Sequence, residues 1–160
     1  MGYIDRRVKI LIIIGILVIS VLSALFIGGM RNTKVIDDSP TATIGENTFR
    51  LEVADSDSKR TQGLSGRASL DIDMGMLFLM EYRNRYVFWM KEMLFPIDIL
   101  WIDGDTIVDI SKDVPIPESE DDIPRVQPLY PVDKVLEINA GEAERLGIVV
   151  GDRVITKNHR

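Results

Sequence analysis

The stretch IDILWIDGDTIVDI at residues 97–110 decides the fold that we expect for this chain. Its two halves, Ile97–Ile102 and Thr106–Ile110, are short apolar runs rich in β-branched residues, which is typical of strands. Asp103 and Gly104 lie between them. An Asp-Gly pair at such a place is a strong signal for a tight hairpin in which both central residues adopt positive φ. The sequence therefore predicts an antiparallel pair that reverses at Asp103–Gly104.

Other short strands are predicted on both sides of this hairpin. TFRLEVA at Thr48–Ala54 alternates apolar and polar residues, as a half-buried strand does. GMLFLM at Gly75–Met80 and YVFWM at Tyr86–Met90 are brief and apolar, which favours strands over helices. Val135–Ile138 is a further strand, and IVVGDRVI at Ile148–Ile155 predicts a turn followed by the last strand.

Two short helices complete the expected elements. Ser56–Gln62 carries Ser and Asp at capping positions, and Gly63 follows it as a stop. Ala140–Leu146 is followed by Gly147, at the position where a left-handed backbone ends a helix. Many short strands with two short helices predict a mainly β or α+β fold, built as a compact, barrel-like mixed sheet.

The remaining segments predict the domain organisation. Residues 31–45 are polar with one proline and predict a linker, and Val114–Pro131 holds five prolines and predicts a long surface loop or lid. We therefore expect five parts in chain order. They are a cytoplasmic N-terminus at 1–9, a transmembrane anchor at 10–30, the linker at 31–45, a globular domain at 46–156 and a tail at 157–160.

The anchor is predicted from ILIIIGILVISVLSALFIGGM at Ile10–Met30, which contains no charge. These 21 residues would span roughly 30 Å as a helix, the thickness of a bilayer core. Arg6, Arg7 and Lys9 precede the run, which places the N-terminus inside and the domain outside the cytoplasm. A cleaved signal peptide is the alternative, but its apolar region is usually shorter. A buried core helix is a third reading.

Composition excludes several classes of function. From Asp38 onward there are 23 acidic and 14 basic residues, a formal net charge of −9, which argues against nucleic acid as a partner. The chain has no cysteine and a single histidine, His159, so thiolate catalysis and the usual serine-hydrolase chemistry are excluded. We expect no cofactor and no metal site, because Asp103, Asp105 and Asp109 lack the spacing of a calcium loop.

Six residues are candidates for a ligand-binding cleft, because guanidinium, ammonium, carboxyl and indole groups can hold an anionic or sugar-like ligand. The candidates are Arg60, Arg67, Trp89, Lys91, Asp98 and Glu137. The alternative is structural: Arg60 or Arg67 pairs internally with Asp98 or Glu137 and ties helix to sheet. Phe88 and Trp89 would lie on opposite faces of a strand, so one of them must leave the core.

Four segments in this order resemble the domain-of-unknown-function 192 family. They are KRTQGLSGR at 59–67, GMLFLM at 75–80, FWMKEMLFPIDILWID at 88–103 and VLEINAGEAERLGIVVGDRV at 135–154. The resemblance implies a small mixed fold rich in strands that is often exported or membrane-anchored, and it implies no particular activity. The ending GIVVGDRV also resembles the Gly-Asp turn of cradle-loop and double-psi barrels, where the aspartate bonds backbone amides. Asp152 is therefore expected to determine the fold.

Three functions remain open from the sequence. The preferred one is a membrane-anchored binding module that presents a cleft outside the cytoplasm to an envelope protein or a small anionic or sugar-like ligand. The second is an envelope-associated enzyme, in which Asp98 or Glu137 acts as acid or base and Arg60 or Lys91 holds substrate charge. The third is a structural accessory domain of a membrane complex. Because no catalytic set is recognisable, we lean away from an enzyme.

Overall fold

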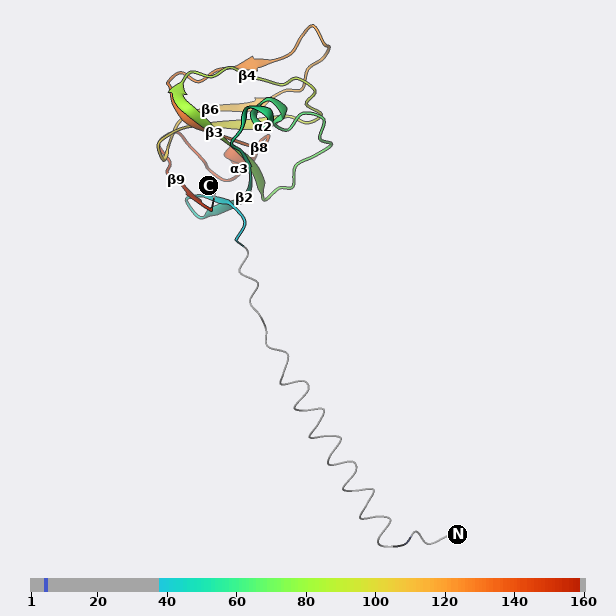
Figure 1. The fold of residues 1–160 in the computed structure, drawn as a ribbon, viewed down its shortest axis with the longest axis vertical. Helices are drawn as coiled ribbons and strands as arrows, with labels where there is room; N and C mark the ends of the chain where they lie inside the picture. Colours follow the sequence, from blue (N-terminus) through green and yellow to red (C-terminus); the bar gives the residue numbers. More distant parts are fainter. Residues whose placement is uncertain (1–4, 6–37, 159–160) are drawn as a thin grey trace. The chain divides into compact units, whose positions relative to one another are not determined.

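The computed structural model describes Asp5 and residues 38–158. The predicted anchor at 10–30 and the charges that would orient it lie outside the described residues. Among the residues that are described, no helix is long and apolar enough to cross a membrane. The folded unit begins at Asp38 and is mainly β, with one large curled sheet, one small sheet and two short helices (Figure 1).

The large sheet has seven strands in the order β6-β5-β8-β3-β2-β1-β9. Strands β2 and β3 run parallel, and every other neighbouring pair runs antiparallel. The strands are β1 (Thr41–Ile44), β2 (Asn47–Ala54), β3 (Met74–Asn84), β5 (Ile97–Asp103), β6 (Thr106–Val114), β8 (Val132–Asn139) and β9 (Val154–Lys157).

The sheet curls until its two edge strands meet at one end, which gives a half-barrel. Thr106 of β6 forms an antiparallel bridge with Arg153, just before β9. The Ile107 amide donates to the Asp152 carbonyl at 2.9 Å, and the Gly151 amide donates to the Ile107 carbonyl at 2.8 Å. The barrel-like mixed sheet expected from the sequence is therefore confirmed as a curled half-barrel.

Both faces of the central strands are buried, because apolar residues occur at odd and even positions alike. Leu77, Leu100 and Leu136 belong to the cluster on one face. Phe78, Trp101 and Val135, each one position away along the strand, belong to the cluster on the other face. Successive strand side chains point to opposite faces, so a strand buried on both sides reads as a continuous apolar run, as in IDILWID.

The second face is covered by short elements. Helix α2 (Asp57–Gln62) is capped by the Ser56 hydroxyl, which accepts from the Lys59 amide at 3.4 Å. Strands β4 (Phe88–Trp89) and β7 (Arg125–Val126) form the small antiparallel sheet.

The other helix belongs to the first face. Helix α3 (Glu142–Arg145) packs Ala143 into the cluster there, and Gly147 follows with a positive φ of 69°.

Most predicted strands and both helices are present, but three details differ. Strand β1 lies within the predicted linker at 31–45, where only Thr, Ala and Ile alternate and no long apolar run marks a strand. The predicted loop Val114–Pro131 contains β7. The hairpin turn is shifted by one residue, because Asp103 pairs with Thr106 and the two turn residues are Gly104 and Asp105.

The shifted turn has a simple physical reason. Gly104 has a φ of 62°, and Asp103 is not among the residues of positive φ. A glycine at the first central position is typical of a type II′ turn, which needs positive φ only there. The turn before β9 follows the prediction, because the Asp152 carboxylate accepts from the Val149 amide at 2.9 Å.

Candidate functional site

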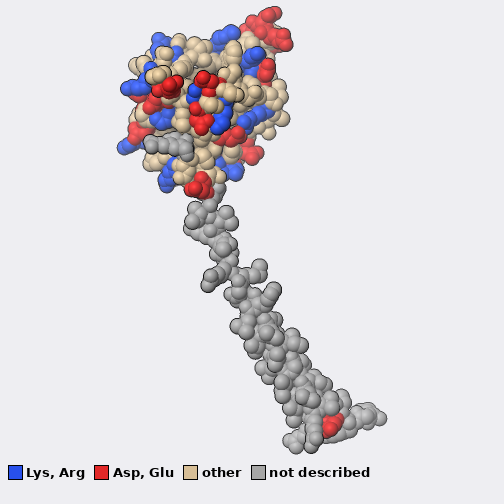
Figure 2. Space-filling model, in the orientation of Figure 1, with Lys and Arg blue, Asp and Glu red and all other residues tan. Residues whose placement is uncertain are grey.

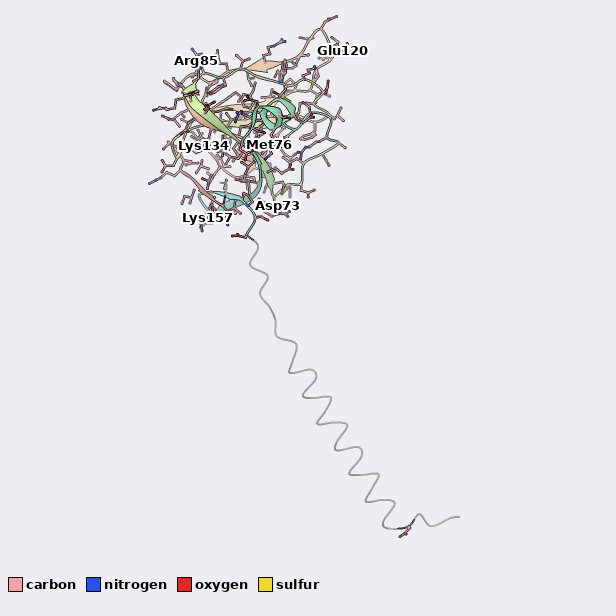
Figure 3. The ribbon with its side chains drawn as sticks, in the orientation of Figure 1. Asp73, Met76, Arg85, Glu120, Lys134 and Lys157 are labelled. Atoms are coloured by element: carbon pink, nitrogen blue, oxygen red, sulfur yellow. The ribbon has the colours of Figure 1, made fainter. Side chains whose placement is uncertain are left out.

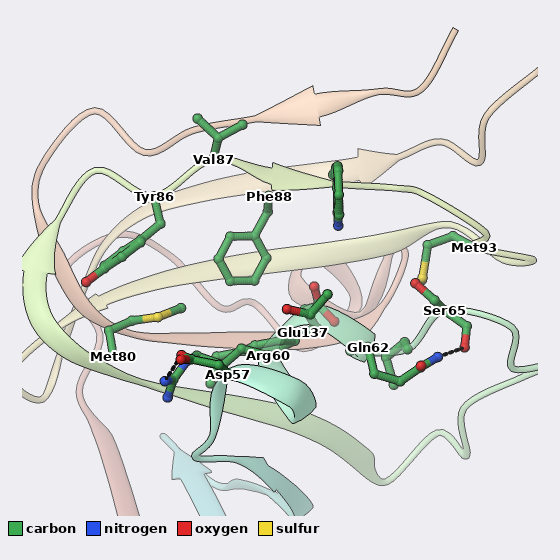
Figure 4. A pocket seen from close by; sticks show the side chains of 15 residues that line it. Asp57, Arg60, Gln62, Ser65, Met80, Tyr86, Val87, Phe88, Met93 and Glu137 are labelled. Atoms are coloured by element: carbon green, nitrogen blue, oxygen red, sulfur yellow. Dashed lines mark hydrogen bonds and ion pairs between the residues drawn. The ribbon is translucent and has the colours of Figure 1, made fainter. Parts of the chain in front are cut away.

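A cavity of about 360 Å³ opens between helix α2 and strand β4, over the second face of the large sheet (Figure 4). This volume lies in the range of small-ligand sites. Four aromatic rings and two methionines contribute to its wall, and residues of α2 and of the segment after it close one side. The residues that line the cavity include Arg60, Leu64, Phe78, Met80, Tyr86, Phe88, Trp89, Met93 and Glu137.

Glu137 reaches this cavity from the middle of the sheet. It lies on β8, with Met76 of β3 and Ile99 of β5 at the neighbouring register positions. Leu136 and Ile138 face the first cluster, so alternation turns Glu137 to the second face. Figure 4 shows its carboxyl between Phe88 and Arg60. Met76, its neighbour on β3, is buried as well, and Figure 3 labels it near the middle of the domain in this view.

The Glu137 carboxyl is buried and incompletely bonded. Its residue is only 6% exposed, and its Oε2 atom has no hydrogen-bond partner. Burial raises the pKa of Glu137 to about 8, and the positive charge of Arg67 opposes that rise only in part. The side chain is therefore mostly protonated at neutral pH and can donate a hydrogen bond into the cavity.

Arg60 lies on α2 at the wall of the cavity. Its Nη1 donates to the Leu79 carbonyl at 2.8 Å, and its Nη2 donates to the Asp57 carboxylate at 2.6 Å. The first bond ties helix α2 to strand β3. The sequence offered Asp98 or Glu137 as structural partners for this arginine, and the structure gives it Asp57 and a backbone carbonyl instead.

Arg67 forms a two-pronged pair with Glu52 of β2. Its Nη2 donates to Glu52 Oε2 at 2.7 Å, and its Nη1 donates to Oε1. This pair lowers the pKa of Glu52 through the hydrogen bond and the charge of Arg67. Arg67 does not line the cavity. Its positive charge nevertheless lowers the pKa of Glu137, which does.

Trp89 lines the cavity, and Lys91 lies beside its ring. Trp89 is 47% exposed, and the Lys91 ammonium lies 5.8 Å from the centre of its ring. Trp89, Lys91 and residues of α2 also line a second hollow beside the first. Phe88 turns inward, with its ring centre 5.0 Å from that of Phe78 and 5.3 Å from that of Trp101. Neighbouring residues of this short strand thus serve the core and the surface, as expected.

Asp98 belongs to a different place, which corrects the expectation of a shared cleft. It is fully buried on β5, and its carboxylate accepts from the amides of Asp113 at 2.8 Å and Ala143 at 2.9 Å. Alternation along β5 places it on the same face as Leu100, opposite to Ile99. Asp98 and Glu137 therefore lie on opposite faces of the sheet, so the two candidate carboxylates do not share one cleft.

Sequence reasoning missed the aromatic and methionine wall. The sequence places Phe78, Met80 and Tyr86 in predicted strands and Met93 in a family-like segment, and it marks none of them as a cavity residue. A signal existed for part of it: Met76, Phe78 and Met80 share one face by their period of two. The cavity itself exists because α2 and β4 pack on the sheet without touching each other everywhere. This tertiary arrangement is not encoded in any local sequence pattern.

The charged side chains on the face in view form no single patch. Positive and negative side chains are interspersed over this face, apart from an acidic projection at the upper right (Figure 2). This projection is the loop around Glu120, far from Asp73 and Lys157 at the opposite end (Figure 3). Within residues 38–158, no three His, Asp or Glu side chains gather so that they could hold a metal ion.

The fold and its cavity define a small half-barrel domain with one aromatic pocket over the sheet. The model of the domain-of-unknown-function 192 family, described as an uncharacterized ACR, matches residues 40–156. The chain therefore belongs to this family, as the four sequence segments predicted.

Two solved structures share the fold. A protein of unknown function from Novosphingobium aromaticivorans is 32% identical, with a TM-score of 0.65, over 73% of this chain and 83% of that one. A putative transcription regulator from Sinorhizobium meliloti is 33% identical, with a TM-score of 0.65, over 73% of this chain and 91% of that one. No curated protein is significantly similar to the chain.

Proposed function

We propose that this protein is a binding module that holds a small ligand, or a side chain of a partner protein, in the cavity between α2 and β4. The observation that carries the proposal is Glu137, a buried carboxyl with an unpartnered oxygen at an open aromatic cavity. A buried polar group without a partner costs about 1–3 kcal/mol. A ligand that completes its bonding would recover part of that cost.

The wall supports the same proposal. Ligand sites combine mostly apolar surface with a few polar groups that fix orientation. Here Phe78, Phe88 and Met80 supply the apolar surface, and Glu137 supplies the polar group. Trp89 is large and half-exposed and lines the cavity, where an aromatic ring can cover a bound molecule.

A fragment screen followed by NMR tests the binding proposal. Fragments should shift the amide signals of residues around the cavity, such as Leu64, Met80 and Phe88. Trp89→Ala should weaken the binding of these fragments, whereas Tyr130→Ala, which removes an exposed aromatic ring outside the cavity lining, should not. Fragments that shift only signals outside the cavity would contradict the proposal.

We further propose that Ile10–Met30 anchors the protein in a membrane and that the domain lies on the extracytoplasmic side. The support is the uncharged length of that segment and the basic residues before it. Anchoring would raise the effective concentration of the binding site near membrane partners, so modest affinity would suffice.

The absence of cysteine allows a direct test of this topology. Single-cysteine variants Ser69→Cys, at an exposed site of the domain, and Tyr3→Cys, before the apolar run, are treated in intact cells with a membrane-impermeant maleimide. We expect labelling of Ser69→Cys in intact cells and of Tyr3→Cys only after lysis. The reverse pattern would place the domain inside the cell.

A further inference from the structure

We propose that the ligand of this cavity carries an ammonium group, which pairs with the carboxylate of Glu137 and lies against the aromatic wall. This inference rests on the proposed binding function and specifies the chemistry of its ligand. It differs from the anionic or sugar-like ligand expected from the sequence, and the experiment below includes an anion for that reason.

The first argument is the chemistry of the wall. The cavity gathers one tryptophan, one tyrosine and two phenylalanines, namely Phe78, Tyr86, Phe88 and Trp89. The faces of aromatic rings attract cations, and grouped rings are the usual way in which proteins recognise substituted ammonium groups. Met80 and Met93 add polarizable, adaptable surface that suits the carbon skeleton of such a ligand.

The second argument is the carboxyl itself. A neutral ligand could be held by a glutamine at this position without the desolvation cost of an acid. A carboxyl differs from an amide because it can ionise, and an ionised carboxylate this deeply buried requires a cation beside it. Glu137 lines the cavity, and one oxygen of its buried carboxyl has no hydrogen-bond partner.

The third argument is that the cations and donors near Glu137 have other partners. Arg67 is paired with Glu52, and Arg60 is paired with Asp57 and the Leu79 carbonyl. The Tyr86 hydroxyl donates to the Tyr82 carbonyl. Within the described part of the chain, no hydrogen bond or ion pair reaches the Glu137 carboxylate, so its counter-charge can come from a ligand.

The charge of the domain favours the same ligand. Residues 38–160 carry a formal net charge of −9, which raises the local concentration of cations and opposes anions. This field does not select a site, but it adds to the preference that the carboxyl creates inside the cavity.

Binding of an ammonium group should release a proton. The pKa of Glu137 is raised to about 8 in the empty cavity, so at pH 7 most molecules hold the proton that the ligand displaces. Affinity should therefore rise with pH and level off above about 8. The charged and titratable groups that face or influence Glu137 are Arg67 and Glu52, Arg60 and Asp57 of α2, and Tyr86.

Isothermal titration of the full-length protein with three probes of one shape tests the inference. Benzylamine is cationic, benzyl alcohol is neutral and benzoate is anionic. We expect benzylamine to bind at least tenfold more tightly than the other two at pH 7. Its binding heat should depend on the ionisation enthalpy of the buffer, with close to one proton released.

Two variants make the test specific. Glu137→Gln should lower benzylamine affinity at least tenfold and abolish the buffer dependence. Glu46→Gln removes one exposed carboxylate in the turn between β1 and β2 and should change neither. If Glu137→Gln does not fold, Trp89→Ala replaces it in the test. This variant should bind benzylamine more weakly, and the binding that remains should still release a proton.

The outcomes separate the two proposals. Equal or tighter binding of benzyl alcohol or benzoate in this cavity would overturn the ammonium inference and leave the binding function standing. Benzylamine binding without proton release, or unchanged in Glu137→Gln, would also overturn it. No binding of any probe at millimolar concentration, together with an empty fragment screen, would overturn both.

Discussion

The carboxylate of Asp98 accepts a hydrogen bond from the backbone amide of Ala143 at 2.9 Å, which joins the middle of the sheet to helix α3. Its other oxygen accepts from Asp113, a residue of positive φ in β6. Ile97 pairs with Val114 and Ile99 with Ser111, so β6 has one more residue than β5 here, as in a bulge. One buried carboxylate therefore fixes both an irregular strand and a short helix.

Asp98→Asn should destabilise the protein by about 2–4 kcal/mol, because the amide side chain keeps one acceptor oxygen and turns a donor toward the other backbone amide. Urea unfolding followed by circular dichroism measures the change. Asp113→Asn is the matched control, because Asp113 is exposed and asparagine tolerates positive φ; it should cost less than about 0.5 kcal/mol. Equal costs in both variants would contradict this role of Asp98.

Glu137 should make the stability of the protein fall as pH rises. Below its ordinary pKa of 4.5, both folded and unfolded states hold the proton. Between 4.5 and about 8 only the unfolded state loses it, so the free energy of unfolding falls by up to about 1.4 kcal/mol per pH unit from this group. Above about 8 both states are ionised and this contribution stays constant.

Glu137→Gln removes that titration, so the variant should gain stability relative to the natural protein as pH rises from 5 to 8. Urea unfolding at three pH values measures the difference, with Glu46→Gln as the control for loss of an exposed carboxyl. Parallel stability curves for Glu137→Gln and the natural protein would show that Glu137 ionises normally in the folded state.

Arg67→Gln should raise the pKa of Glu137 above about 8, because the guanidinium lowers it in the natural protein. A carbon-13 NMR titration of the glutamate carboxyls measures this pKa directly. The loss of the Arg67–Glu52 pair itself should cost no more than about 1 kcal/mol, since both side chains are partly exposed. Arg153→Gln breaks the exposed pair with Asp105 and should leave the titration of Glu137 unchanged.

Gly75→Ala should destabilise the sheet next to the cavity. A Cβ at this position would lie 2.9 Å from Leu136 Cδ1 and 3.1 Å from the Glu137 carbonyl oxygen. Overpacking of this kind costs about 1–3 kcal/mol. Adding Leu136→Val to Gly75→Ala should restore part of the loss, because it shortens one of the two crowded groups. Simple additivity of the two costs would show that Leu136 is not the obstacle.

The sequence predicts the strands well where the pattern is local. The structure has strands at the alternating segment Thr48–Ala54 and at the apolar run Ile97–Ile102. It also has a glycine of positive φ, Gly147, after the second helix. Strand β1 escapes prediction because four residues of mixed polarity become a strand only when β2 and β9 pair with both of their edges. The pairing with β9, which lies near the other end of the sequence, leaves no local trace.

The candidate site was predictable only in part, for a related reason. Charged and aromatic residues in the family-like segments make Arg60, Trp89 and Glu137 candidates, and all three line the cavity. The same reasoning included Asp98, because a sequence does not reveal which face of a doubly buried strand a carboxylate occupies. The partner that each arginine takes, Asp57 or Glu52, likewise depends on how α2 and the following segment pack on the sheet.

The meeting of β6 and β9 has a consequence for how the protein behaves among its neighbours. Exposed strand edges are templates on which other chains add strands, the route to aggregation and domain exchange. Near Ile107 and Asp152 the two outer strands satisfy each other's backbone groups, so this end of the sheet offers no free template. The domain can therefore be crowded against other proteins with a reduced hazard of sheet-to-sheet association.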